Sequence, residues 1–324
     1  MHWFTFSPND FSYAFLSVLF EGVPFLLLGS LISGFVDVFV SPEKLAQALP
    51  KNPFAALLVT GLLGVIPICE CGSVVVVRRF LRKGLPLSCA VTYMLAAPIV
   101  NPLVALSTWA AFRGQSQMVM VTFRLGLGYL IAVGAGFLIQ QFATKNILQP
   151  GVIQEPRNRR GLSISAAPSD DAAPNFSDIA QGASIPRKLL LAIQSATADF
   201  LDVAFFFILG TAIACVFNTA VDRQIIMPFA TQPFLAILVL MGLAVLVALC
   251  SNTDAFIAAS FAAFPPSAKI AFLVFGPVFD LKLFWLYGIL FRRRFVAILG
   301  ICLFVAIAFI AWQISPIVDL GPGR

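Results

Sequence analysis

Eight apolar runs, each of membrane-spanning length or close to it, restrict how this sequence can fold. They lie at Phe11 to Val40, Phe54 to Val77, Leu85 to Phe112, Met118 to Phe142, Phe200 to Phe217, Phe234 to Phe264, Ile270 to Phe291 and Phe295 to Ile314. A helix needs roughly 20 apolar residues to cross a bilayer. With 60% hydrophobic and 11% charged residues, the chain has more apolar surface than a soluble core can hide. The sequence therefore predicts an all-α polytopic membrane protein.

The second run is interrupted by the hexapeptide Pro67 to Gly72, which reads Pro-Ile-Cys-Glu-Cys-Gly. An acidic residue at the bilayer centre costs roughly 2.5 to 3.5 kcal/mol, so Glu70 needs compensation. Proline disfavours a helical residue before it, and glycine permits unusual dihedral angles. We predict a helix break with extended backbone that points Cys69 and Cys71 the same way, beside a cavity. The alternative is two buried structural cysteines, with Glu70 paired to a neighbouring helix.

Other polar residues interrupt the apolar runs. Asn101 stands between two prolines in the segment Ala97 to Pro102, which predicts either a helix break that frees carbonyls and makes Asn101 a buried hydrogen-bond donor and acceptor, or a simple proline kink. Glu21, in the first run, is either a helix-packing hydrogen-bond partner or part of a proton path. Asn101 is therefore either a substrate-contacting residue or part of a simple kink. Glu21 is either a proton-coupling residue or a helix-packing residue.

The run Phe234 to Phe264 is interrupted at Cys250 to Asp254, which reads Cys-Ser-Asn-Thr-Asp. We expect Asn252 or Thr253 to cap a half-helix that begins near Asp254. Asn252 and Asp254 are then candidate substrate-binding residues, although Asp254 is also consistent with a capping carboxylate alone.

The pattern of the first half starts again in the second half. The matching features keep an offset of 179 to 181 residues: Glu21 and Gly29 with Asp202 and Gly210, Pro53-Phe54 with Pro233-Phe234, Cys69 with Cys250, Pro98 and Asn101 with Pro277 and Asp280, and Arg113 with Arg292. A shared order at a shared spacing indicates a duplicated unit. Paired interruptions in corresponding runs are typical of transporters with a substrate site near the midplane.

Loop charges favour one topology. If the runs from Phe54 and from Phe234 re-enter on the side they left, 15 Lys and Arg lie inside and 4 outside, with Arg124 and Lys282 within spans. This asymmetry agrees with the positive-inside rule. Re-entry also makes each half cross the membrane an odd number of times, so the two repeats are inverted, with re-entrant hairpins that meet at the midplane. We expect an outside N-terminus, whereas crossing of both runs gives a weaker asymmetry.

The chain divides by composition into four segments. We expect a first membrane repeat at residues 1–142, a polar cytoplasmic linker at 143–195, a second membrane repeat at 196–316 and a C-terminal tail at 317–324. The net charge of +6 lies in loops, as topology requires, and does not indicate nucleic-acid binding. No cofactor or resident metal is expected, the lipid bilayer is an expected partner, and the composition leaves the oligomeric state open.

The motifs resemble a known family. The hexapeptide, the segment Arg82 to Pro86 and the segment Ala97 to Pro102 are similar to the bacterial predicted-permease family, whose characterised members export trivalent organoarsenicals. The resemblance covers Phe11 to about Ile314 and implies that Cys69 and Cys71 bind the metalloid. It also implies a multi-pass protein of the bacterial cytoplasmic membrane. The family commonly reads Cys-Ser-Cys-Gly where this chain has Glu70, which adds a negative charge between the thiols.

We therefore expect a secondary transporter for a small thiophilic solute and not an enzyme. Two soft thiols favour thiophilic partners over hard cations. Glu21, Asp202, Asp280 and Lys282 are candidates for proton coupling, and we expect Lys282 to pair either with Asp280 or across helices. The alternatives are a permease for a divalent cation or a sulfur-containing anion, and an intramembrane thiol oxidoreductase. The oxidoreductase is disfavoured because redox pairs usually read Cys-x-x-Cys.

Overall fold

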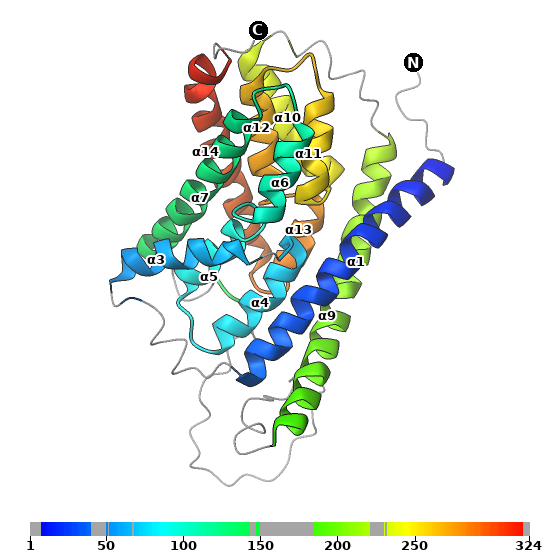
Figure 1. Cartoon of the computed structure of the whole chain (residues 1–324), viewed down its shortest axis with the longest axis vertical. Coiled ribbons are helices and arrows are strands. Elements are labelled where there is room, and N and C mark those ends of the chain that lie inside the picture. The colour runs from blue at the N-terminus through cyan, green and yellow to red at the C-terminus, as the bar shows by residue number, and fades with distance from the viewer. Residues whose placement is uncertain are drawn as a thin grey trace.

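The computed structural model describes residues 8–39, 50, 52–66, 68–142, 147–149, 184–220, 230 and 232–319. Its elements are all helical (Figure 1). In order they are α1 (Pro8–Phe39), α3 (Pro53–Leu62), a 3-10 turn (Leu63–Val65), α4 (Glu70–Arg82), α5 (Leu87–Ala96), α6 (Pro102–Ala111), α7 (Gln117–Phe142), α9 (Ile185–Ala220), α10 (Pro233–Val247), α11 (Ser251–Ser260), α12 (Pro266–Phe275), α13 (Leu281–Tyr287) and α14 (Arg293–Val318). Pro67 and most of the predicted linker lie outside the described residues. Helix α9 includes the last residues of the segment assigned to the linker.

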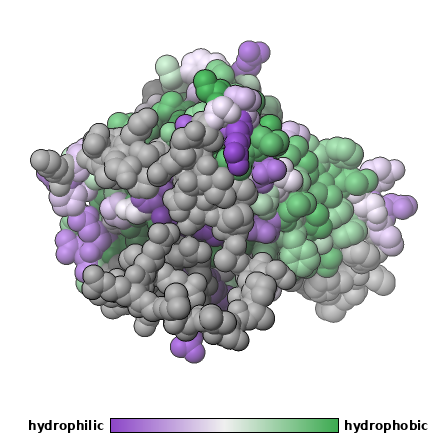
Figure 2. All heavy atoms as spheres, turned by 90° about the horizontal axis from the view of Figure 1, so that it is seen from below, coloured by the Kyte–Doolittle hydropathy of each residue, from purple (hydrophilic) through white to green (hydrophobic). Residues whose placement is uncertain are grey.

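Four helices in the described part of the chain are long and apolar enough to cross a membrane: α1, α7, α9 and α14. In Figure 1 shorter apolar helices such as α5, α6 and α12 lie between these long helices, whereas α3 lies at the left edge. Large apolar side chains on the long helices point outward, among them Phe20 on α1 and Phe205 on α9, which are 77% and 65% exposed. Figure 2 shows hydrophobic atoms gathered on the flank at the right, where α1 and α9 lie in Figure 1. The prediction of an all-helical, multi-pass membrane protein is confirmed.

Helices α1 and α9 pack along each other and run in opposite directions (Figure 1). Their contact depends on Gly34, where an added Cβ would lie 2.2 Å from the backbone oxygen of Ala192. No real Cβ approaches a backbone atom so closely, so only glycine allows this crossing.

The third and seventh apolar runs are each divided into two helices. The turn at Ala97 to Val100 separates α5 from α6, and the side chain of Asn101 caps α6 by accepting a hydrogen bond from the Leu103 backbone N–H at 2.9 Å. Asp280 likewise caps α13, with 2.6 Å between its Oδ1 and the Leu283 nitrogen. The predicted break at Asn101 is therefore confirmed over a simple proline kink.

The second and sixth runs are also broken, but their helices begin earlier than predicted. Helix α4 begins at Glu70, so only Cys69 has extended backbone, and the prediction that both thiols lie on unwound chain is wrong. Helix α11 begins at Ser251, three residues before the predicted start near Asp254, because a left-handed residue, Ala248 (φ 46°), ends α10 and redirects the chain.

Glycines on α7 face two different environments. Added Cβ atoms at Gly128 and Gly136 would lie 2.4 Å from Ile99 Cγ2 and 1.9 Å from Thr92 Oγ1. Gly126 and Gly134 face open space. One side of α7 thus packs closely on its neighbours, and the other side is open.

We predict that Gly34→Leu weakens the α1–α9 contact, because the new side chain meets rigid backbone of α9. Overpacking of this kind costs about 1–3 kcal/mol. The measurement is thermal unfolding of the purified protein in detergent, with Gly126→Leu as the control because its position is open. Equal unfolding temperatures for the two variants would contradict the prediction.

Candidate functional site

A buried ion pair lies where three interrupted helices meet. The Lys282 ammonium group on α13 is 3.2 Å from Glu70 Oε1 at the start of α4, and both side chains are 2% exposed. Lys282 also lies 3.7 Å from the Asp280 carboxylate. Lys282 therefore pairs across helices as well as with Asp280. The latter contact is possible because Asp280 precedes the helix as its cap.

The same glutamate connects α4 to α11. The Ser251 hydroxyl, on the first residue of α11, donates to Glu70 Oε2 at 3.4 Å. Glu70 is itself the first residue of α4. The carboxylate thus lies at the helix end whose exposed N–H groups favour negative charge.

Two glycines on the long helices bring those helices against this cluster. An added Cβ at Gly29 of α1 would lie 2.6 Å from Gly72 Cα in the first turn of α4. An added Cβ at Gly210 of α9 would lie 3.0 Å from Lys282 Cα. The ion pair is therefore enclosed by close backbone packing on both sides.

Three buried cysteines surround the ion pair. Cys69 caps α4, and its sulfur accepts a hydrogen bond from the Gly72 N–H at 3.3 Å. The Cys71 thiol contacts Cys69 and lies within electrostatic range of Glu70 and Lys282. Cys250 stands at the N-cap position of α11, without a side-chain capping hydrogen bond, and is within electrostatic range of the same two charges. No disulfide joins these three thiols.

A buried arginine that we did not predict as a site residue supports α11. Arg124 of α7 is fully buried and donates to Thr108 Oγ1 at 2.7 Å and to the Ser251 backbone oxygen at 2.6 Å. A lone arginine within an apolar run was the sequence signal that could have identified it. Its role is visible only in the fold, since Ser251 lies 127 residues away.

Two carboxylate oxygens near the cluster, Asp254 Oδ2 and Asp280 Oδ2, have no hydrogen-bond partner within the described residues. Asp280 Oδ2 is nevertheless the oxygen that lies 3.7 Å from the Lys282 ammonium group. An added Cβ at Gly276 would lie 2.9 Å from Asp254 Oδ2, so this carboxylate faces the turn between α12 and α13. Across the residues that the structure places, no three His, Cys, Asp or Glu side chains are grouped closely enough to hold a metal ion.

The other predicted residues lie around this cluster rather than within it. Asn252 accepts a hydrogen bond from Ser107 of α6 at 3.4 Å, and Glu21 of α1 is hydrogen-bonded to Thr253 of α11. Asn101 is buried and caps α6. The structure thus joins Cys69, Glu70, Cys71, Asp280 and Lys282 closely, whereas Asn101 and Asn252 bond elsewhere.

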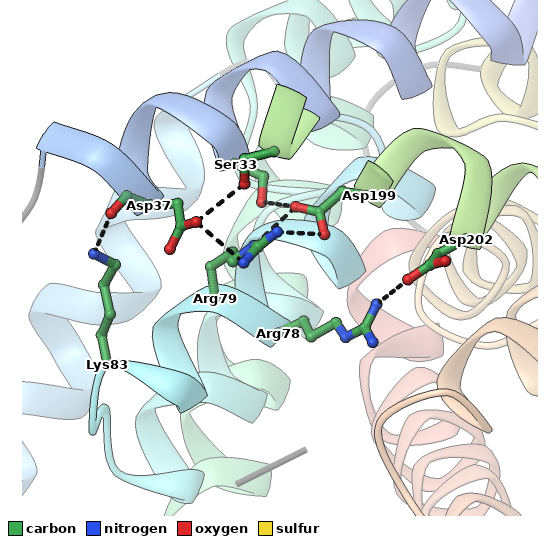
Figure 3. Close-up of polar contacts among 8 residues, drawn as sticks. Ser33, Asp37, Arg78, Arg79, Lys83, Asp199 and Asp202 are labelled. Carbon is green, nitrogen blue, oxygen red and sulfur yellow. Dashed lines mark hydrogen bonds and ion pairs between the residues drawn. The ribbon is translucent and has the colours of Figure 1, made fainter. Parts of the chain in front are cut away.

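A second polar cluster fixes the other end of α4 between α1 and α9 (Figure 3). Arg79 makes two 2.9 Å hydrogen bonds to Asp199 of α9 and lies 3.1 Å from Asp37 of α1. Ser33 donates to Asp199 at 2.8 Å, and Ser195 donates to Asp37 at 3.0 Å. This buried network connects three helices and compensates the charge of Arg79.

Flanking contacts extend the second cluster (Figure 3). Arg78 pairs at 2.8 Å with Asp202, whose side chain is 52% exposed. The Lys83 ammonium group donates to the Asp37 backbone oxygen at 2.8 Å. Asp202, predicted as a proton-coupling residue, therefore lies in this cluster and not beside the thiols.

Comparisons with known proteins show what this chain resembles. A family described as "Predicted permease" matches residues 9–314. The UPF0718 protein YcgR of Bacillus subtilis is 36% identical over 287 residues, covering 88% of this chain and 90% of that protein. A Streptococcus mutans protein named "Putative two-component membrane permease complex subunit" is 32% identical over 284 residues, 87% of each chain. No solved structure matches.

We predict that removing one partner of the buried pair destabilises the protein. Lys282→Met leaves Glu70 without its cation, which costs about 3–5 kcal/mol, whereas Glu70→Gln leaves Lys282 with its 3.7 Å contact to Asp280 and should cost less. The double variant should lose less than the sum of the two single variants, because the charges of Glu70 and Lys282 are both removed and only Asp280 loses a partner. Denaturant unfolding in detergent micelles measures all three.

The control for this prediction is Arg78→Gln. Its partner Asp202 is half exposed, so the loss should be about 0–1 kcal/mol. Additive losses in the Glu70 and Lys282 double variant would show that the two side chains do not interact.

Proposed function

The chain belongs to the predicted-permease family and is a multi-pass membrane permease, and from this premise we propose that its solute passes the cluster around Glu70 and Lys282. One observation supports this most: a charged pair and two thiols lie buried where the interrupted helices α4, α11 and α13 meet. Ionisable residues within a membrane protein are costly and are usually functional. Interrupted helices provide free backbone groups for a solute.

We propose that the transport unit consists of two inverted repeats, α1 to α7 and α9 to α14. Three features support the duplication: Gly29 and Gly210 both lie against the cluster, Cys69 and Cys250 both stand at the N-cap position of a half-helix, and Asn101 and Asp280 both cap the helix after a turn. The opposite directions of α1 and α9 support the inversion (Figure 1). In this proposal α3–α4 and α10–α11 are re-entrant hairpins, and the basic loops and the linker are cytoplasmic.

The proposed substrate is a small trivalent organoarsenical, moved out of the cell across the cytoplasmic membrane. The negative charge that Glu70 adds between the thiols argues against a neutral arsenical. The pairing of Glu70 with Lys282 answers this point, because the lysine balances the charge of the glutamate within the site. A neutral methylarsenite could exchange two hydroxyl groups for the thiols of Cys69 and Cys71, with release of two water molecules and no change in net charge.

Proton coupling is the proposed energy source. The carboxylates of Glu70, Asp280 and Asp254 are buried around Lys282, and a proton that neutralises one of them would change which carboxylate the lysine holds. Glu21 is half-buried and bonded to Thr253, so it is a candidate entry point to this group. Asp202 is a candidate further along the protein, beside Arg78.

A permease for a divalent cation is the second candidate. The Asp254 carboxylate favours it, because its Oδ2 has no hydrogen-bond partner within the described residues and carboxylate oxygens are ligands for hard cations. Asp254 and Asp280 would have to rearrange before they could hold an ion together, since Lys282 lies against Asp280.

Transport in inside-out vesicles distinguishes the two candidates. We expect uptake of methylarsenite by the wild type, and loss of uptake in Cys69→Ser and Cys71→Ser, because serine does not bind trivalent arsenic as a thiol does. Cys302→Ser is the matched control, since this cysteine is exposed on α14. Methylarsenite uptake that survives in both serine variants would refute the thiol site. Uptake of a divalent cation that is lost in Asp254→Asn but not in the serine variants would also refute it.

A further inference from the structure

An apolar groove runs along the outside of the molecule between α7 and α14. Its volume is about 920 Å³. The α7 wall includes Leu127, Leu138 and Phe142. The α14 wall includes Phe295, Leu303 and Ile310. Several lining side chains are open to the surroundings, for example Leu138 at 55% and Ile298 at 60% exposure. Because both walls are membrane-spanning helices, the groove faces the lipid.

The charged residues of this lining are both arginines. Arg292 and Arg294 lie at the start of α14, beside Ile147, whose backbone oxygen accepts a 3.0 Å hydrogen bond from the Arg292 N–H. No carboxylate forms an ion pair with either guanidinium group within the described ranges. Arg293 points elsewhere, since it lies over the ring of Trp285 at 5.1 Å. The groove thus combines apolar walls with two arginines at one end that form no ion pair with a described carboxylate.

A glycine keeps the α7 wall of the groove open. Gly134 lines the groove, and an added Cβ there would have no neighbour within 4 Å. Gly126, two turns earlier on the same helix, is also open but does not line the groove. The two positions therefore differ in their relation to the groove alone.

We propose that this groove binds an anionic phospholipid, with an acyl chain along α7 and α14 and the phosphate at Arg292 and Arg294. Charge complementarity supports this occupant, since basic sites between membrane helices bind anionic headgroups and arginine pairs well with phosphate. A lipid places its charge at the membrane surface, where the arginines lie at the end of the spanning helix.

Native mass spectrometry of the full chain in detergent tests the proposal, with phosphatidylglycerol and phosphatidylcholine of the same acyl chains as probes. The wild type should retain phosphatidylglycerol preferentially. The double variant Arg292→Gln, Arg294→Gln should lose about 30-fold in affinity for phosphatidylglycerol and keep its binding of phosphatidylcholine. Arg293→Gln, the matched control, should keep the preference because its side chain is engaged by Trp285.

A second pair of variants tests the apolar part of the groove. Gly134→Leu should reduce retention of both lipids because the leucine fills the groove, and Gly126→Leu should leave retention unchanged. Unchanged lipid retention in Gly134→Leu, or an unchanged preference in the double arginine variant, overturns the proposal. A dimer, or a complex with a second membrane protein, that dissociates on Gly134→Leu also overturns it, since a protein would then occupy the groove.

Discussion

The pairing of Glu70 with Lys282 is the interaction on which the centre of this protein depends. Each charge would be prohibitively costly alone in the hydrocarbon layer, and the pair is tolerated because the two groups lie 3.2 Å apart, with Ser251 and Asp280 adding further contacts. Both charges lie at the start of a helix. Helix α13 begins at Leu281, one residue before Lys282, and α4 begins at Glu70.

Interrupting helices in a membrane creates unsatisfied backbone groups, and this chain satisfies part of them with nearby side chains. Asn101 and Asp280 accept hydrogen bonds from backbone N–H groups in the turns that follow them, and the Cys69 sulfur does the same for Gly72. Arg124 satisfies the Ser251 carbonyl from another helix. The polar residues that stand out in the sequence therefore stabilise the helix ends at the breaks. A substitution that keeps the capping hydrogen bond, such as Cys69→Ser, separates this structural role from contact with the solute.

Much of this arrangement could be predicted from the sequence, because the signals are local. Prolines and polar residues within apolar runs marked the breaks near Cys69, Asn101 and Asp280, and the presence of a charge within a span marked Lys282. The starting residues of α4 and α11 were placed less well, since cysteine is not an obvious capping residue. The network of Arg79 with Asp37 and Asp199 could not be predicted, because Asp199 lies 120 residues from Arg79 and nothing local in the sequence indicates which charges meet.

The ion pair also constrains how related sequences can diverge. A serine in place of Glu70 would leave Lys282 with only the longer contact to Asp280. A lineage that loses the acid is therefore under pressure to replace the lysine as well, and one that gains the lysine must first acquire the acid. Positions 70 and 282 should thus covary, and their joint identity would separate subfamilies with a charged centre from those with a neutral one.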